Sequence, residues 1–264
     1  MELLTILVTG LLSLLAPVGI IVDRIAEIEL RSQFNHVGQL HVRIDNVPSH
    51  QLLQGKVERV RIAGRSLQLK RHNIHITALE VETDAIDATF NPQIELKQPL
   101  QAGVSVVLTQ QDALQALNYA IASGLFNTNI SKRGRRTPAQ RLNFVNPRIE
   151  FLGNNRLRIR VELAQGEAAP LAITVESGLG VKAETQLELI APVVFVAGEK
   201  VPEQIISAIA ADFTQQLNLS QWKRYGLQSR ILQLKITPQK LEIAAFVRVE
   251  PSSQLLKALT TRAS

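Results

Sequence analysis

Hydrophobic and polar residues alternate along most of this chain, in the pattern typical of strands that bury one face. Leu40, Val42 and Ile44, for example, alternate with polar neighbours. Alternation or short apolar runs recur over residues 60–69, 74–81, 103–108, 143–151, 156–163, 171–175, 186–196, 231–236 and 241–249. This succession predicts a large antiparallel sheet with one polar face, because a parallel sheet would need many more helices between its strands.

Two segments have helical spacing instead. Residues 109–124 begin with Thr109 and Asp112, which resemble a capping box, and their apolar residues then recur on one side as far as Gly124. Residues 202–217 begin with Pro202, and proline is favoured in the first turn of a helix. The order is strands, helix, strands, helix and strands. Because no linker-like segment interrupts it, the sequence predicts one α+β domain.

The N-terminal residues form a region of their own. Residues 3–22 carry no charged side chain, and about 20 apolar residues match the thickness of a bilayer core. No Lys or Arg precedes them and no clear cleavage site follows. An uncleaved membrane anchor, a cleaved signal and a buried or interfacial helix therefore all stay open. We divide the chain into this span with an amphipathic helix (1–30), a domain (31–250) and a tail (251–264).

The composition narrows the chemistry. Of the 264 residues, 45% are hydrophobic, which suffices for a large core, and none is cysteine, which excludes disulfides, thiol nucleophiles and iron–sulfur clusters. We expect no metal, because His72 and His75 would point to opposite faces of a strand. We expect no cofactor, because Gly178 and Gly180 predict a turn rather than a dinucleotide loop. A Gly-x-Ser-x-Gly elbow is absent, so a non-enzyme is favoured, although a Ser/His/Asp set assembled by folding stays open.

Positive charge is concentrated in one segment. Residues 127–160 hold nine Lys and Arg but one acidic residue, Glu150, so their charge exceeds the +6 of the whole chain. The candidates for contact with lipid headgroups or an anionic membrane surface are Lys132, Arg133, Arg135, Arg136 and Arg141. The alternatives are a solvated loop and a nucleic-acid site, but aromatic residues form only 4% of the chain, which disfavours stacking on bases. Arg156, Arg158 and Arg160 share one face of a predicted strand, where they extend this field or face water.

Apolar helix faces and one tryptophan complete the candidate sites. The helices carry stripes that either pack in a core or line a tunnel for acyl chains: Leu114, Leu117, Ile121, Ile205, Ile209, Phe213 and Leu217. Trp222, beside basic residues, is typical of a membrane–water interface. Its alternative position is against the core at the end of a helix.

Two longer stretches resemble a known family. Residues 42–60 read VRIDNVPSHQLLQGKVERV, which is a strand, a proline, a Leu-Leu-Gln-Gly sequence and a second strand. Residues 108–117, LTQQDALQAL, contain Leu-Thr-x-x-Asp at the entry to a helix. Together with the apolar N-terminal span, these stretches resemble the LmeA-like phospholipid-binding family, in particular its cyanobacterial-type members, over about residues 10–250.

The resemblance implies a tubular lipid-binding-like architecture, in which a large curved antiparallel sheet is wrapped around a long helix and encloses apolar space. It also implies a cell-envelope protein without catalytic residues. Gly55 and Asp112 correspond to motif positions, with roles in maintaining the fold rather than in contacting ligand. The chain departs from the family after the proline, because Ser49, His50 and Gln51 stand where many members have an aromatic residue.

We therefore expect a non-enzymatic protein that binds, and in a stronger version transfers, phospholipids or other acyl lipids. An apolar tunnel would hold the acyl chains, and the basic segment would hold headgroups or an anionic membrane surface. The N-terminal segment would anchor the protein in a membrane, with the domain in the periplasm or a similar lumen such as that of thylakoids. The alternative is a structural envelope scaffold whose core is filled and whose basic segment recruits partners or membrane.

Overall fold

The structure is a computed structural model, and it describes residues 27–28, 30–45, 55–70, 74–90, 94–123, 143–165 and 168–254. The apolar span of residues 3–22 lies outside these ranges, so the three interpretations of it stay predictions. Within the described ranges, no helix is both long enough and apolar enough to cross a membrane.

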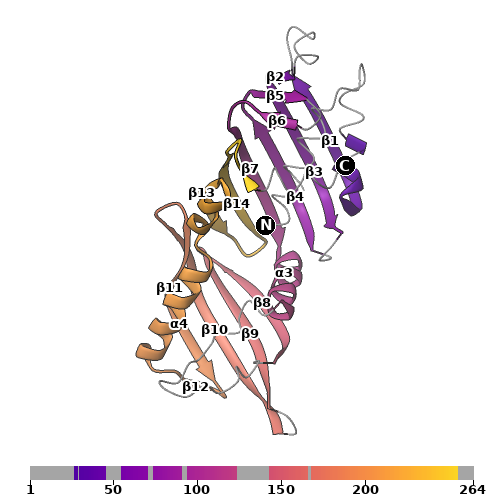
Figure 1. Ribbon diagram of the computed structural model, residues 1–264. Coiled ribbons are helices and arrows are strands. Elements are labelled where there is room, and N and C mark those ends of the chain that lie inside the picture. Colours follow the sequence, from indigo (N-terminus) through magenta and orange to yellow (C-terminus); the bar gives the residue numbers. More distant parts are fainter. Residues whose placement is uncertain are drawn as a thin grey trace.

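Strands dominate this part of the chain and pair antiparallel. One sheet has six strands in the order β1 (Phe34–Asp45), β3 (Arg59–Leu69), β4 (His75–Thr83), β7 (Leu100–Thr109), β14 (Lys240–Val249) and β13 (Leu227–Ile236). Another has five in the order β12 (Glu199–Lys200), β11 (Gln186–Val196), β10 (Ala168–Lys182), β9 (Arg156–Gln165) and β8 (Phe144–Gly153). A small sheet pairs β2 (Lys56–Val57), β5 (Ile86–Phe90) and β6 (Ile94–Leu96). Figure 1 shows the six-stranded sheet above the five-stranded sheet, so the molecule is elongated.

Helices flank these sheets: α3 (Gln110–Ala122), α4 (Glu203–Gln216) and the 3₁₀-helix η2 (Leu219–Tyr225). The predicted capping box of α3 is confirmed, because Thr109 and Asp112 each accept the other's backbone N–H through their side chains. α3 packs against β8, β7 and β4, and α4 packs against β11. The α+β class is confirmed. A long helix wrapped by the sheet is not shown, because α3 and α4 have 13 and 14 residues and the described sheets are open.

The predicted strands are present, but several have different limits. β1 begins at Phe34 rather than at residue 40, and the short strands β5 and β6 were not predicted. The predicted turn at Gly178 and Gly180 is wrong, because both lie inside β10. A Cβ on Gly180 would lie 2.6 Å from the Cδ1 atom of Ile190 on β11. These glycines therefore admit a neighbouring side chain rather than reverse the chain.

The buried apolar residues form two clusters. The larger cluster belongs mainly to the six-stranded sheet, and its most deeply buried members include Leu40, Val60, Ile62, Leu67, Leu79, Leu227 and Val249. The smaller cluster joins α3, the β8–β9 hairpin and β13 through Ala113, Phe151, Leu157 and Ile236. The smaller cluster therefore fixes one end of the five-stranded sheet to the six-stranded sheet.

Asn155, in the turn between β8 and β9, connects the two large sheets. Its backbone carbonyl accepts the N–H of Leu179 on β10 at 2.8 Å. Its side-chain oxygen accepts the N–H of Ile236 on β13 at 2.8 Å, and its own backbone N–H donates to the carbonyl of Ile236 at 3.3 Å. Asn155 thus forms hydrogen bonds with both β10 and β13. Its backbone is left-handed, with a φ of 56°, a conformation that asparagine tolerates better than most residues.

Replacing Asn155 with Ala is expected to lower the free energy of unfolding by about 2 kcal/mol, because the buried Ile236 would lose the acceptor for its N–H. Asn154→Ala is the matched control, since Asn154 is exposed and also left-handed, with a φ of 49°. Urea unfolding of both variants separates the stability that the hydrogen bond contributes from the cost of placing Ala in a left-handed backbone. Equal losses in the two variants would contradict the role of the Asn155 side chain.

Candidate functional site

The five-stranded sheet has one apolar and one charged face. On β9, Leu157, Ile159, Val161 and Leu163 lie on one face, and the arginines lie on the other. Antiparallel register extends the apolar face across β10, where Val175 is opposite Ile159 and Ile173 is opposite Val161. Val194 of β11 and Val175 are partners as well. The apolar face therefore runs across β9, β10 and β11.

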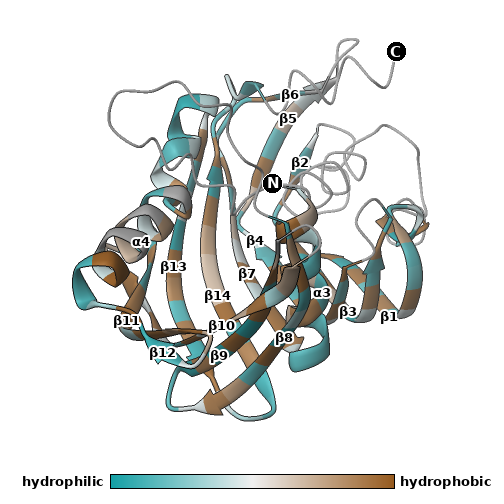
Figure 2. Cartoon of the chain, turned by 90° about the horizontal axis from the view of Figure 1, so that it is seen from below, coloured by the Kyte–Doolittle hydropathy of each residue, from teal (hydrophilic) through white to brown (hydrophobic). Residues whose placement is uncertain are grey.

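Much of this apolar face is only partly buried. Phe151, Leu157 and Val194 are buried, but the side chains between them are of intermediate exposure: Ile159, Val161, Leu163, Leu171, Ile173, Val175 and Val196. α3 packs against one edge strand, β8, and α4 packs against β11 near the other edge, so the two helices lie beside opposite edges of the sheet (Figure 2). Partly exposed aliphatic side chains in the middle of a sheet face are characteristic of a surface that receives an apolar ligand.

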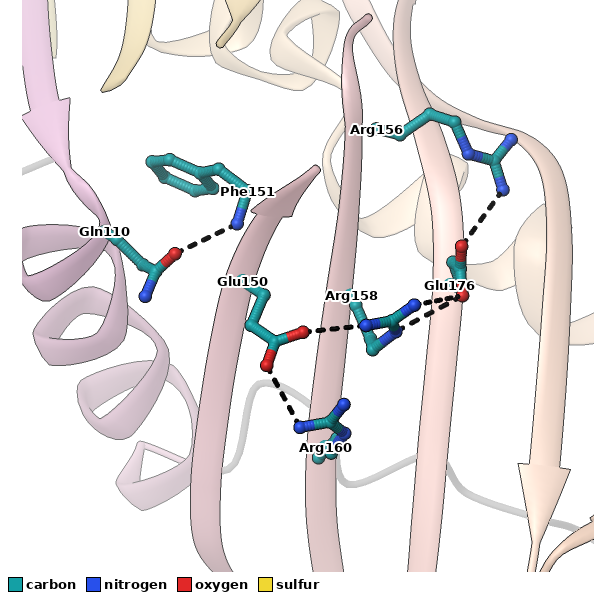
Figure 3. Close-up of polar contacts among 7 residues, drawn as sticks. All are labelled: Gln110, Glu150, Phe151, Arg156, Arg158, Arg160 and Glu176. Atoms are coloured by element: carbon teal, nitrogen blue, oxygen red, sulfur yellow. Dashed lines mark hydrogen bonds and ion pairs between the residues drawn. The ribbon is translucent and has the colours of Figure 1, made fainter. Parts of the chain in front are cut away.

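On the charged face, the arginines of β9 are paired with carboxylates (Figure 3). Arg158 donates to Glu150 of β8 at 2.8 Å and to Glu176 of β10 at 3.1 Å. Arg160 donates to Glu150 at 3.0 Å, and Arg156 lies 3.9 Å from Glu176. The hydrogen bond from Arg158, aided by the charges of Arg158 and Arg160, holds the pKa of Glu150 below its usual range.

These ion pairs change the interpretation of the arginine row. The sequence suggested that the three side chains extend a positive field or face water, whereas Glu150 and Glu176 pair with them across neighbouring strands. The hydrogen bonds to Glu150 and then Glu176 also raise the pKa of Arg158. The row is therefore a network that ties β8, β9 and β10 together, and much of its charge is compensated locally.

The predicted tunnel residues lie on two separate helices. On α3, Leu117 is buried, and Leu114 and Ile121 are partly buried. On α4, Phe213 and the following Leu217 are partly buried, whereas Ile205 is 53% exposed; the side chain of Ile209 lies outside the described residues. Because α3 packs against β8 and α4 packs against β11, the two stripes lie near opposite edges of the five-stranded sheet. Their contact with lipid stays a prediction.

The predicted headgroup residues fall into two groups. Lys132, Arg133, Arg135, Arg136 and Arg141 lie outside the described residues, so their role stays a prediction. Trp222 of η2 is partly buried and packs against the larger core cluster, which is the alternative position that the sequence left open. In the ranges that the structure describes, no group of three or more His, Asp or Glu side chains is placed to hold a metal.

A polar cluster that the sequence did not reveal joins Asp112 of α3 to β4. The carboxylate of Asp112, whose side chain is 3% exposed, accepts Thr77 Oγ1 at 2.5 Å and the backbone N–H of Thr109 at 2.8 Å through Oδ2. Its Oδ1 lies 2.6 Å from Nδ1 of His75. Burial alone would raise the pKa of Asp112, but the hydrogen bonds from Thr77, Thr109 and His75 outweigh burial and lower it. Asp112 is therefore an ionised carboxylate that fixes α3 to the sheet.

Ser66 of β3 extends this cluster. Its hydroxyl lies 3.0 Å from Nε2 of His75, the second ring nitrogen. The backbone N–H of His75 donates to Gln115 Oε1 of α3 at 2.9 Å, which fixes the start of β4 against the helix. The only sequence signal for the cluster was the position of Asp112 in the capping box, because Ser66 and His75 carry no motif.

The comparisons with known proteins give one match. The family model described as LmeA-like phospholipid-binding matches residues 16–246. Neither the curated proteins nor the solved structures contain a match. The matched range includes the apolar face of the five-stranded sheet, both helices and the Asp112 cluster. Because this range covers most of the chain, the protein belongs to the LmeA-like phospholipid-binding family.

Proposed function

We propose that the protein binds phospholipids without changing them, and that their acyl chains lie on the apolar face of the five-stranded sheet between α3 and α4. The observation that carries this proposal is the partial exposure of the aliphatic side chains in the middle of that face, such as Val161 and Ile173. Each CH₂ group transferred from water to this surface contributes about 0.8 kcal/mol. An acyl chain of ordinary length would therefore bind without any charged contact.

The basic segment between α3 and β8 is the proposed contact for the lipid headgroups. Lys132, Arg133, Arg135, Arg136 and Arg141 belong to the connection between α3 and β8, and these two elements pack against each other beside the apolar face. The phosphate groups of lipids attract such a segment, because each basic residue near an anionic membrane surface contributes about 1 kcal/mol to the binding free energy. We further propose that the N-terminal segment anchors the domain to a membrane on the periplasmic or luminal side, where transfer between bilayers is the stronger form of the function.

A scaffold with a filled core is the second candidate. The six-stranded sheet favours it, since residues such as Val60 and Leu67 are 0% exposed and leave no room for a ligand among them. The two candidates differ at the five-stranded sheet, where a scaffold needs no occupant. Bound lipid therefore distinguishes them.

Native mass spectrometry of the full chain, released from detergent in the spectrometer, tests the proposal. We expect a population whose added mass equals that of a phospholipid, because the apolar face binds acyl chains during purification. Protein that is detected without bound lipid is then incubated with vesicles of phosphatidylglycerol, and its mass is measured again. A mass that still equals the bare chain would reject phospholipid binding and favour the scaffold.

A further inference from the structure

Ser66, His75 and Asp112 come from three different elements and form one continuous hydrogen-bonded row. Ser66 is on β3, His75 begins β4, and Asp112 is in the first turn of α3. The Ser66 hydroxyl lies 3.0 Å from Nε2 of His75, and Nδ1 of the same ring lies 2.6 Å from the Asp112 carboxylate. A hydroxyl, an imidazole and a buried carboxylate in this order are the nucleophile, base and orienting group of serine-based acyl transfer.

We propose that Ser66 and His75 are catalytic residues that hydrolyse small water-soluble carboxylic esters rather than the lipid held on the five-stranded sheet, and that Asp112 positions the imidazole. This activity goes beyond lipid binding and does not rest on it, because the three residues lie on the six-stranded sheet and its helix α3 rather than on the apolar face. The identification is geometric, since serine triads recur on unrelated folds and are recognised by the roles of their members.

The surroundings of Asp112 fix the orientation of the imidazole. Oδ2 of the carboxylate is occupied by Thr77 and by the backbone N–H of Thr109, which leaves Oδ1 for Nδ1 of His75. A carboxylate at Nδ1 favours the tautomer with its proton there, so Nε2 is free to accept the proton of the Ser66 hydroxyl. Thr77 is thus a second positioning residue, because it holds the carboxylate on the side opposite His75.

Solvent reaches the Ser66 and His75 end of the row, whereas the Asp112 end is buried. The side chain of His75 is 29% exposed and that of Asp112 is 3% exposed, while Ser66 is of intermediate exposure. Ser66 also has a φ of 53°, a left-handed conformation that is uncommon for serine inside a strand. Backbone strain of this kind concentrates at functional sites.

Gly38 of β1 provides the space beside Ser66. A Cβ atom at this position would lie 2.9 Å from Cβ of Ser66 and 3.0 Å from the carbonyl oxygen of Arg65. Any larger residue would therefore displace Ser66 from its present geometry, so the glycine preserves the distance between the hydroxyl and His75.

The proposed reaction has two balanced halves. The Ser66 oxygen forms a bond to the ester carbonyl carbon, its proton moves to Nε2 of His75, and the ester C–O bond breaks as that proton passes to the departing alcohol. Water then attacks the acyl-serine, gives its proton to Nε2, and the bond to Ser66 breaks as the serine recovers a proton. The sum is ester plus water giving carboxylic acid plus alcohol, without an oxidant or metal.

A fluorophosphonate probe and p-nitrophenyl butyrate test this proposal on the full chain. We expect one phosphonate adduct, mapped to Ser66 by peptide mass spectrometry, and measurable ester hydrolysis. Ser66→Gly should abolish both while keeping the fold, since glycine accepts the left-handed backbone. His75→Gln should lower the hydrolysis rate about 100-fold or more. Ser207→Ala on α4 is the control that should leave both unchanged, because that hydroxyl only donates to the carbonyl of Glu203.

Three results would overturn the proposal. The first is the absence of an adduct at Ser66 in the folded protein, and the second is equal labelling of folded and urea-unfolded chains. The third is hydrolysis that persists in Ser66→Gly. A labelling rate that does not change with pH would also contradict a His75 base, because only an unprotonated imidazole accepts the serine proton. None of these outcomes depends on whether phospholipid binds.

Discussion

Replacing Asp112 with Asn is expected to lower the free energy of unfolding by about 3 kcal/mol, because the change removes a charge that three donors surround. Asp112 accepts hydrogen bonds from Thr77 and from the backbone of Thr109, and contacts His75. An amide has one acceptor oxygen instead of two, so at least one buried donor loses its partner. Urea unfolding at neutral pH measures the loss.

Asp84→Asn is the matched control for this prediction. Asp84 is exposed, and only its backbone N–H makes a described bond, to the carbonyl of Gln101. The same substitution there should change stability by less than about 0.5 kcal/mol. A similar small loss at both positions would contradict the structural importance of the Asp112 carboxylate.

Acid titration gives the same prediction a second readout. Because folding lowers the pKa of Asp112, its ionised form contributes stability above the pKa of an unfolded aspartate, about 3.9. That contribution is lost as the pH falls through the still lower pKa of the folded state. Asp112→Asn lacks it at every pH, so the difference in stability between the two proteins should shrink as the solution is acidified.

Local structure was predictable because it depends on short-range patterns. Alternation at Leu40, Val42 and Ile44 marks a strand whatever it pairs with, and Thr109 with Asp112 forms a capping box within four residues of chain. β5 was missed because a five-residue strand offers little alternation. The family was predictable for the same reason, since its motifs are local sequences at strand and helix ends.

The clusters were not predictable because they depend on pairing between distant segments. Arg158 meets Glu176 only through the register of β9 against β10, in which the two residues are direct partners. Ser66, His75 and Asp112 meet only because β3 pairs with β4 and α3 packs against β4. No spacing rule in one sequence contains this information. The division into a six-stranded and a five-stranded sheet was missed for the same reason.

Replacing Ile173 with Glu is expected to weaken phospholipid binding about tenfold or more, because an ionised carboxylate would have to lose water beside an acyl chain. Ile173 is in the middle of the apolar face, is partly buried and pairs with Val161. Native mass spectrometry of the full chain, after incubation with phosphatidylglycerol vesicles, measures the bound fraction directly.

Thr174→Glu provides the control that locates the binding face. Thr174 is the next residue of β10, so its side chain points to the charged face, where its partner across the sheet is Arg160. Thr174→Glu introduces the same carboxylate on the same strand as Ile173→Glu. On the charged face, however, the new carboxylate lies opposite the positive charge of Arg160, so lipid binding should be retained. Thermal unfolding of both variants checks that the sheet is intact. Loss of lipid in both folded variants, or in neither, would mean that acyl chains do not lie on the apolar face, because only the face distinguishes the two substitutions.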